Sequence, residues 1–192
     1  NAAGIMVSTN SHLTMTGGTI ADGTVEDRGA GVYHNKSTGT YTGGTISGNK
    51  AGIEGAGIYA TGSTLKLSGV RVKNNQSPNS GGVGLSTKCD VTMTAGEISG
   101  NSGENGAGVL IASKSNFKMS GGKISGNTVT NSGGGIYLSK NAFMTITGGE
   151  ISGNTAGKNG GAVFVSTNSF MEMSGGKITG NSGVAGGGIY LY

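Results

Sequence analysis

The stretch Gly121-Gly122-Lys123-Ile124-Ser125-Gly126-Asn127 returns in variant form throughout this chain of 192 residues. Its hydrophobic residue recurs at a nearly constant interval, at Ile20, Ile46, Val72, Ile98, Ile124, Ile151 and Ile178. Repetition at such a fixed period is the signature of a repeat architecture, in which each unit buries its apolar residues against its neighbours. Because the chain has 42 glycines and only 11% charged residues, it would otherwise be expected to be disordered.

Two further segments keep the same period. One of them reads Gly133-Gly134-Gly135-Ile136-Tyr137-Leu138 in its fullest form, and its first core residue recurs at Ile5, Val32, Ile58, Val83, Val109, Ile136, Val163 and Ile189. The other alternates apolar and polar residues, as in Phe117-Lys118-Met119 and Val91-Thr92-Met93. Alternation at period two is typical of a β-strand with one buried face. Each repeat is therefore expected to hold three short strands.

Stacked repeats place equivalent strands side by side at ~4.8 Å and close a continuous apolar core. We therefore predict an all-β parallel β-helix, or β-solenoid, of about seven coils with 26–27 residues and three short strands per coil, forming one domain over residues 1–192. Because parallel crossovers are almost always right-handed, a right-handed coil is expected. The chain begins and ends inside a strand motif without a cap, which favours a fragment of a longer chain and end-to-end self-association.

An asparagine follows the Ser-Gly pair or its equivalent in nearly every repeat. Side-chain amides stacked at strand spacing can hydrogen-bond along a column and satisfy the backbone groups of a bend. We predict a structural asparagine ladder at this bend, preceded by Gly23 in the first coil. Its members are Asn49, Asn75, Asn101, Asn127, Asn154 and Asn181.

The position before the recurring hydrophobic residue alternates in charge along the second part of the chain. The residues are Arg71, Glu97, Lys123, Glu150 and Lys177. Opposite charges on neighbouring strands attract by roughly 0.2–1 kcal/mol per pair. This column is expected to support the register between coils, which explains its two glutamates without a catalytic role.

One coil departs from the apolar pattern, because His34 stands in a column otherwise filled by small or aliphatic residues such as Leu85. Tyr41 points inward in the same coil, and Gly39 leaves space beside it. We predict a buried hydrogen bond between His34 and Tyr41 that satisfies both polar groups.

The sequence offers little for catalysis or metal binding. Asp22, Glu26 and Asp27 could hold a cation weakly, although a solvated loop is the more ordinary interpretation of such a cluster. No column supplies the two carboxylates that glycoside hydrolysis needs across a groove. Cys89 is the single cysteine, and two histidines are too few for a metal site. We expect no enzyme activity, no catalytic residues, no metal and no cofactor.

Two classes of partner are also disfavoured. No apolar run reaches eighteen residues, so this segment is not expected to insert into a membrane. The net charge of +4 is spread along the chain without a block of Lys and Arg, so nucleic acid is not an expected partner.

An outward column of the Gly-Ile-Tyr strand is the candidate binding surface. It is expected to form an exposed aromatic stripe, since Tyr offers a large rigid face with a polar tip. Cross-strand stacking that stabilises the sheet is the alternative interpretation. The turn beside the stripe carries lysines that would give it a basic edge. The candidate residues are Tyr33, Tyr59, Leu110, Tyr137, Phe164, Tyr190, Lys88, Lys114 and Lys140.

A Thr-x-Thr pattern such as Thr92-Met93-Thr94 returns in several coils, as it does in some ice-binding solenoids. Lys66, Lys118 and Glu172 interrupt the array. The β-propensity of threonine on an exposed strand explains the column better.

The motifs Gly121–Asn127 and Gly133–Leu138 resemble the repeats of bacterial adhesin-like surface proteins with right-handed β-helix regions, such as the polymorphic outer membrane proteins of Chlamydia. This resemblance implies display outside the cell or at its surface, and adhesion to a host protein, receptor or glycan. It carries no catalytic residues over to this chain. A structural stalk that displays another domain is the alternative function, and a carbohydrate-active enzyme is a less favoured one.

Overall fold

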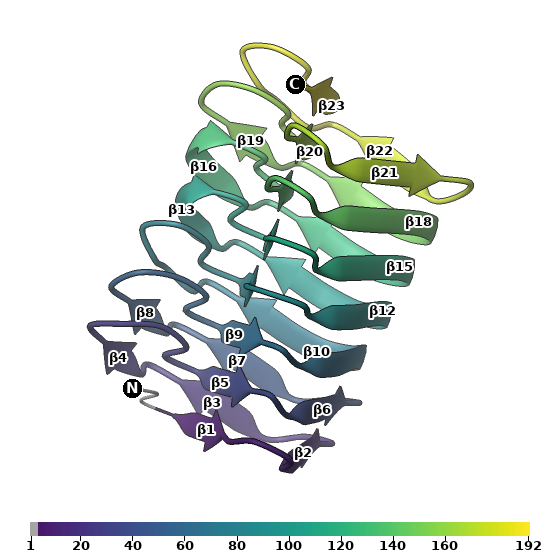
Figure 1. The fold of residues 1–192 in the computed structure, drawn as a ribbon. Coiled ribbons are helices and arrows are strands. Elements are labelled where there is room, and N and C mark those ends of the chain that lie inside the picture. The colour runs from purple at the N-terminus through teal and green to yellow at the C-terminus, as the bar shows by residue number, and fades with distance from the viewer. Residues whose placement is uncertain (1–3) are drawn as a thin grey trace.

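The computed structural model describes residues 4–192, and every regular element in that range is a β-strand. The chain winds into stacked coils, with the two ends of the described chain at opposite ends of the rod (Figure 1). All paired strands are parallel, and equivalent strands of successive coils are neighbours in each sheet. The predicted all-β solenoid is confirmed, and so is its period, because equivalent residues of successive coils are register partners over most of each strand.

Sheet A is built from the Gly-Ile-Tyr segments and contains eight strands in the described range. Each strand follows a glycine-rich bend, and its first and third residues point inward in the middle coils. The strands are β1 (Ile5–Val7), β5 (Val32–Asn35), β9 (Ile58–Thr61), β11 (Val83–Leu85), β14 (Val109–Ile111), β17 (Ile136–Leu138), β20 (Val163–Val165) and β23 (Ile189–Leu191).

Sheet B unites the other two predicted segments of each coil. In the middle of the rod they run together as ten-residue strands, which bend at the Gly-Gly pair or its equivalent. Two breaks in register mark this bend between β10 and β12. The first segments are β2 (His12–Met15), β6 (Thr38–Tyr41) and β21 (Phe170–Met173), the second are β3 (Thr19–Ala21), β7 (Thr45–Ser47) and β22 (Lys177–Thr179), and the united strands are β10 (Thr64–Lys73), β12 (Asp90–Ser99), β15 (Asn116–Ser125) and β18 (Phe143–Ser152).

A further short parallel pairing follows the ladder position in each coil, after Gly23 in the first coil and after an asparagine in the later ones. We name this face sheet C. It comprises β4 (Thr24–Val25), β8 (Lys50–Ala51), β13 (Ser102–Asn105), β16 (Thr128–Ser132) and β19 (Thr155–Ala156), with Gln76 bridging Lys50 and Ser102. The predicted three strands per coil are therefore present in the middle of the rod, but two of the predicted segments are united in sheet B and the third strand is the one in sheet C. The segments of sheet C are too short and too rich in small residues to show an alternating apolar pattern.

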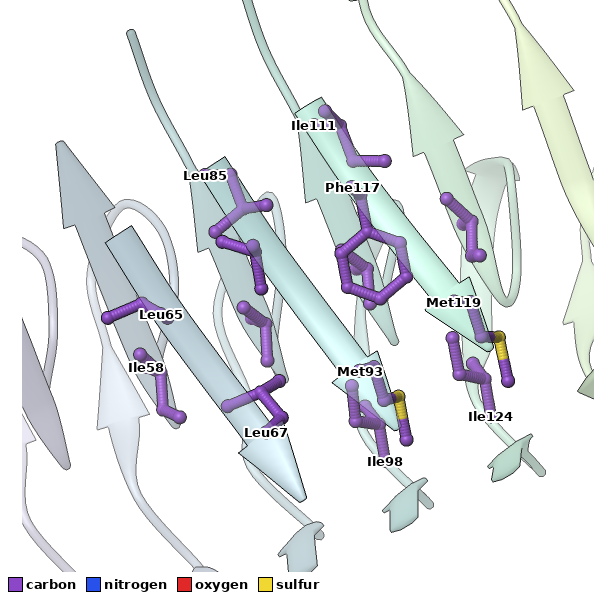
Figure 2. Packing of buried hydrophobic residues seen from close by; sticks show 14 of the residues in the cluster. Ile58, Leu65, Leu67, Leu85, Met93, Ile98, Ile111, Phe117, Met119 and Ile124 are labelled. Carbon is purple, nitrogen blue, oxygen red and sulfur yellow. The ribbon is translucent and has the colours of Figure 1, made fainter. Parts of the chain in front are cut away.

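The core runs the length of the rod between sheets A and B. Equivalent apolar residues stack coil upon coil, as Figure 2 shows for Leu67, Met93 and Met119. Burying one such side chain stabilises the fold by roughly 1.5–3 kcal/mol. The bend glycines leave room for this packing. Gly122 has a φ of 83°, and a Cβ there would lie 2.6 Å from the terminal methyl group of Met93.

The predicted asparagine ladder is confirmed. Asn75 donates its backbone N–H and one Nδ2 hydrogen to Oδ1 of Asn101, each at 3.0 Å. The other Nδ2 hydrogen goes to the carbonyl of Ile46 at 3.0 Å. The same three bonds recur along the column, which is fully buried from Asn49 to Asn154. Every amide group of these buried side chains is therefore satisfied.

A second column of polar residues lies at the turn between sheets A and B. It was not predicted from the sequence. Ser63 accepts the backbone N–H of Ser37 at 3.0 Å and donates to the carbonyl of Thr61 at 2.8 Å. Cys89 occupies the same column, where its thiol contacts the Ala60 carbonyl oxygen at 3.2 Å and burial raises its pKa. The even spacing of Ser37, Ser63, Cys89 and Ser115 was the available signal.

The predicted contact between His34 and Tyr41 is present at 2.6 Å, and both side chains are fully buried. The imidazole also contacts the Ser37 hydroxyl at 2.8 Å. Burial lowers the pKa of His34 to about 4 and raises the pKa of Tyr41, so both groups are neutral at pH 7. A Cβ at Gly39 would lie 2.9 Å from the imidazole, so this glycine provides the space.

Candidate functional site

The predicted aromatic stripe forms one column on sheet A. Its residues are direct register partners in the order Met6, Tyr33, Tyr59, Gly84, Leu110, Tyr137, Phe164 and Tyr190. The rings stack on one another. Tyr137 and Phe164 lie 4.9 Å apart at 10°, and Phe164 and Tyr190 lie 5.6 Å apart at 7°. The interpretation as stabilising cross-strand stacking therefore has direct geometric support.

The expected exposure of the stripe is wrong for two of its members. Tyr59 is only 6% exposed and Phe164 only 7%. Phe164 is covered because rings stack on both of its sides. Tyr59 is covered by the bend of its own coil, by Tyr33 at 5.1 Å and by the guanidinium group of Arg28 at 5.6 Å. Tyr33, Leu110, Tyr137 and Tyr190 stay partly exposed.

Gly84 divides the stripe into two parts, and Glu54 occupies the space that a larger residue would fill. A Cβ at Gly84 would lie 3.0 Å from Cγ of Glu54. Nε of Arg28 lies 3.9 Å from the Glu54 carboxylate, and each side chain keeps one buried polar atom without a hydrogen-bond partner. Burial raises the pKa of Glu54, against the opposing effect of Arg28.

The three lysines of the proposed basic edge are exposed in the turns between sheets A and B. Lys88 and Lys114 hold equivalent left-handed positions with φ of 55° and 61°. The matching residue of the next coil is Asn141, at φ 61°. Lys140 therefore lies in the predicted turn, one position before the residue that matches the other two lysines. The cause lies earlier in that coil, where the register between β13 and β16 shifts and β16 takes in an extra residue.

Sheet C carries a feature that the sequence did not predict. A groove of about 640 Å³ runs along it, and four consecutive coils each contribute three residues to its lining. The outward residues Lys50, Gln76, Ser102 and Thr128 are register neighbours along this groove. Glu104 adds a negative charge beside them. The groove thus offers amide, hydroxyl and charged groups at strand spacing.

The predicted charge column is confirmed as a set of register partners from Arg71 to Lys177. Lys123 and Glu150 form an ion pair at 3.4 Å. A hydrogen bond from Ser152 and the charge of Lys123 lower the pKa of Glu150. These carboxylates are placed next to cations of neighbouring coils.

A comparison with models of protein families shows which family the chain belongs to. The model described as the right-handed beta helix region matches residues 1–147 and residues 55–192. The chain belongs to this family. The predicted right-handedness agrees with the family, and the match says nothing about adhesion. No curated protein and no solved structure matched the chain.

The acidic residues of the first coil do not converge in this right-handed β-helix. Asp27 forms an ion pair with Arg28 at 2.8 Å. Throughout residues 4–192, no three or more His, Cys, Asp and Glu side chains come together in a group that could hold a metal ion. The same range contains no helix that is long and apolar enough to cross a membrane.

The threonine column lies on the outer side of sheet B in the register that the sequence predicts. Lys66, Lys118 and Glu172 interrupt it at the expected coils. The column is therefore not a continuous threonine array.

A pair of exposed aromatic rings on the same outer side of the β-helix was not predicted. Phe143 is 48% exposed and Phe170 is 56% exposed, and the two residues are register partners in β18 and β21. The available signal was a phenylalanine at the outward position before an inward methionine in each of these two strands, one repeat apart.

Proposed function

We propose that this β-helix is a non-enzymatic interaction module, displayed outside the cell or at its surface, that binds an extended glycan along the groove of sheet C. The observation that carries the proposal is the lining of this groove by polar side chains from four consecutive coils. Successive coils repeat at ~4.8 Å, close to the length of one sugar unit in a linear chain. A polymer lying along the rod could therefore meet a similar set of groups at each step.

The chemistry of the groove supports a glycan more than a folded protein partner. Gln76, Thr128 and Thr130 are exposed and supply hydrogen-bond donors and acceptors for sugar hydroxyls. Pro78 is exposed in the same groove and adds apolar contact. The aromatic stripe of sheet A is a weaker candidate, because two of its rings are buried. Its exposed members remain the alternative face for a host protein or receptor.

The test is binding to an immobilised panel of linear polysaccharides that includes hyaluronan, heparan sulfate and xylan. We expect at least one to bind the unmodified chain, and Thr128→Trp to weaken that binding at least tenfold by filling the groove. Thr92→Trp is the matched control, because Thr92 stands on the outer side of sheet B. Equal affinity of Thr128→Trp and the unmodified chain would refute the groove, and loss in Tyr137→Ser would move the site to the stripe.

A structural stalk is the second candidate function. It is favoured by the unbroken asparagine ladder, which joins successive coils and uses its amides for bonds within the fold. Failure of the unmodified chain to bind any glycan or host surface protein in the panel would favour the stalk.

A further inference from the structure

The outward residues of sheet B change from polar to aromatic along the rod. The outward column that contains Phe143 and Phe170 begins with polar residues in earlier coils, where Thr38 pairs with His12 and Thr64 pairs with Asp90. Asn116 then donates to the Asp90 carboxylate at 3.2 Å. The next two coils replace these groups by two half-exposed rings. Contiguous exposed apolar area of this kind often marks a contact with another molecule.

The neighbouring outward column carries opposite charges on the two sides of Thr145. Lys118, Thr145 and Glu172 are consecutive register partners, so the cation and the anion stand one coil on either side of Thr145. Lys118 and Glu172 are two strands apart, roughly 10 Å. Turning this column end over end about Thr145 exchanges the positive and the negative position. The face is therefore complementary in charge to itself.

We propose that two copies of this chain pair face to face through this part of sheet B, with their rods antiparallel. A two-fold axis that runs along strand β18 sets Phe143 against Phe143 and Thr145 against Thr145 of the second copy. It also sets Lys118 of each copy against Glu172 of the other, which gives two symmetric ion pairs beside the paired Phe143 rings. Each Phe170 ring then faces Asn116 of the other copy. Such an interface is isologous and closes as a dimer.

The opposite arrangement, with the two rods parallel, fits the residues poorly. A two-fold axis along the rod reverses the strand direction and keeps each strand opposite its own copy. Placed over the column of Phe143, it pairs the rings but gives Lys118 and Glu172 no partner of opposite charge. Placed over Thr145, it sets Lys118 against Lys118 and Glu172 against Glu172. Placed between the two columns, it sets Glu172 against Phe170, so a carboxylate loses water without gaining a cation. The charges therefore select the antiparallel pair.

The contact is small. Stable interfaces bury about 1,200–2,000 Å² in total, whereas only a few strands take part here. We expect a dimer that forms at micromolar or higher concentration and weakens in salt. The pairing face lies on sheet B and is separate from the groove, so it goes beyond the proposed function and can fail without affecting it.

Sedimentation equilibrium over a range of concentrations tests the pairing. We expect a reversible dimer that Lys118→Glu or Glu172→Lys weakens at least tenfold. The double variant Lys118→Glu/Glu172→Lys restores the opposite charges and should regain most of the affinity. A monomer at every concentration would overturn the proposal, and so would a double variant no better than the single ones. Circular dichroism of each variant verifies the fold.

Cross-linking with a short bis-maleimide tests the orientation, because sheets packed face to face lie ~10 Å apart, beyond the reach of a disulfide. In a Cys89→Ser background, Thr145→Cys should give a covalent dimer, because this residue lies on the two-fold axis. Thr92→Cys is the control, because it stands two coils from the axis and meets no copy of itself. Linkage through Thr92→Cys with none through Thr145→Cys would contradict the antiparallel pair.

Discussion

The asparagine ladder and the aromatic stripe are both columns that recur once per coil, yet only the ladder is continuous. Each asparagine between Asn49 and Asn154 is buried, and each makes its bonds to the same atoms of the next coil. The stripe admits Gly84 and Leu110 among its rings. A change of one asparagine removes hydrogen bonds on both of its sides, because its neighbours lose their partners. An outward stacked column loses only part of its packing.

This difference distinguishes residues that support the fold from residues that could recognise a partner. The buried asparagines repeat in every coil and carry little information about a partner, whereas the outward columns vary from coil to coil. Candidate contacts with other molecules should therefore be sought where the repeat departs from itself, as at Phe143 or Lys118.

The largest effect is expected from Asn101→Ala. This change leaves the backbone N–H and the Nδ2 group of Asn75 without an acceptor, and the Val72 carbonyl without a donor. A buried polar group left unpaired costs about 1–3 kcal/mol, so the free energy of unfolding should fall by about 4 kcal/mol. Urea denaturation measures this decrease in the free energy of unfolding. Asn181→Ala is the control, since Asn181 is only half-buried; equal losses in both variants would contradict the ladder's importance in the interior.

The buried His34 is expected to make the stability of the fold depend on pH. Its pKa is lowered to about 4 in the fold from 6.5 in the unfolded chain, because burial disfavours the charged imidazole. Between these two values the unfolded state binds the proton and the folded state does not. Stability is therefore highest above pH 6.5 and should fall by up to about 3 kcal/mol as the pH drops through 6.5 toward and below 4.

The double variant His34→Leu/Tyr41→Phe removes both partners of this hydrogen bond, and leucine already fills the same column at Leu85 and Leu138. Thermal unfolding of both proteins between pH 7 and pH 4 isolates the histidine contribution, because the carboxylates are common to the two. A pH dependence of the same size in both proteins would show that His34 does not contribute to it.

The smallest effect is expected in the stripe. Phe164→Leu keeps an apolar side chain but removes the ring stacked between Tyr137 and Tyr190. Aromatic pairs add about 0.5–1.5 kcal/mol each beyond their buried area, so the free energy of unfolding should decrease by about 1–2 kcal/mol. Leu110→Ala is a suitable comparison, because Leu110 has no stacked ring. A loss in Phe164→Leu as large as that of Asn101→Ala would remove the distinction between the two columns.

The features that depend on the period could be predicted from the sequence. Equal spacing identified the coil, the asparagine ladder, the charge register and the inward position of His34. Its contact with Tyr41 followed because a buried histidine needs a partner and Gly39 left space for one. The serine column had the same signal at Ser37 and Ser63.

Features that depend on the path of the bends could not be predicted from spacing alone. Tyr59 is buried by the neighbouring bend and by Arg28, which belongs to another coil. The offset of Lys140 from the column of Lys88 and Lys114 could not be predicted, because a longer spacing between repeats does not tell which segment of the coil holds the extra residue. The groove of sheet C arises from segments without apolar alternation, such as Gln76–Pro78.

The direction of the hydrogen bonds has a mechanical consequence. Because successive coils are joined through parallel strands and stacked amides, the bonds between two coils point along the rod. A tensile force between the ends of the rod acts on all bonds of one coil boundary together, and on successive boundaries in series. The force at which the rod yields is then set by its least bonded boundary, however many coils are added.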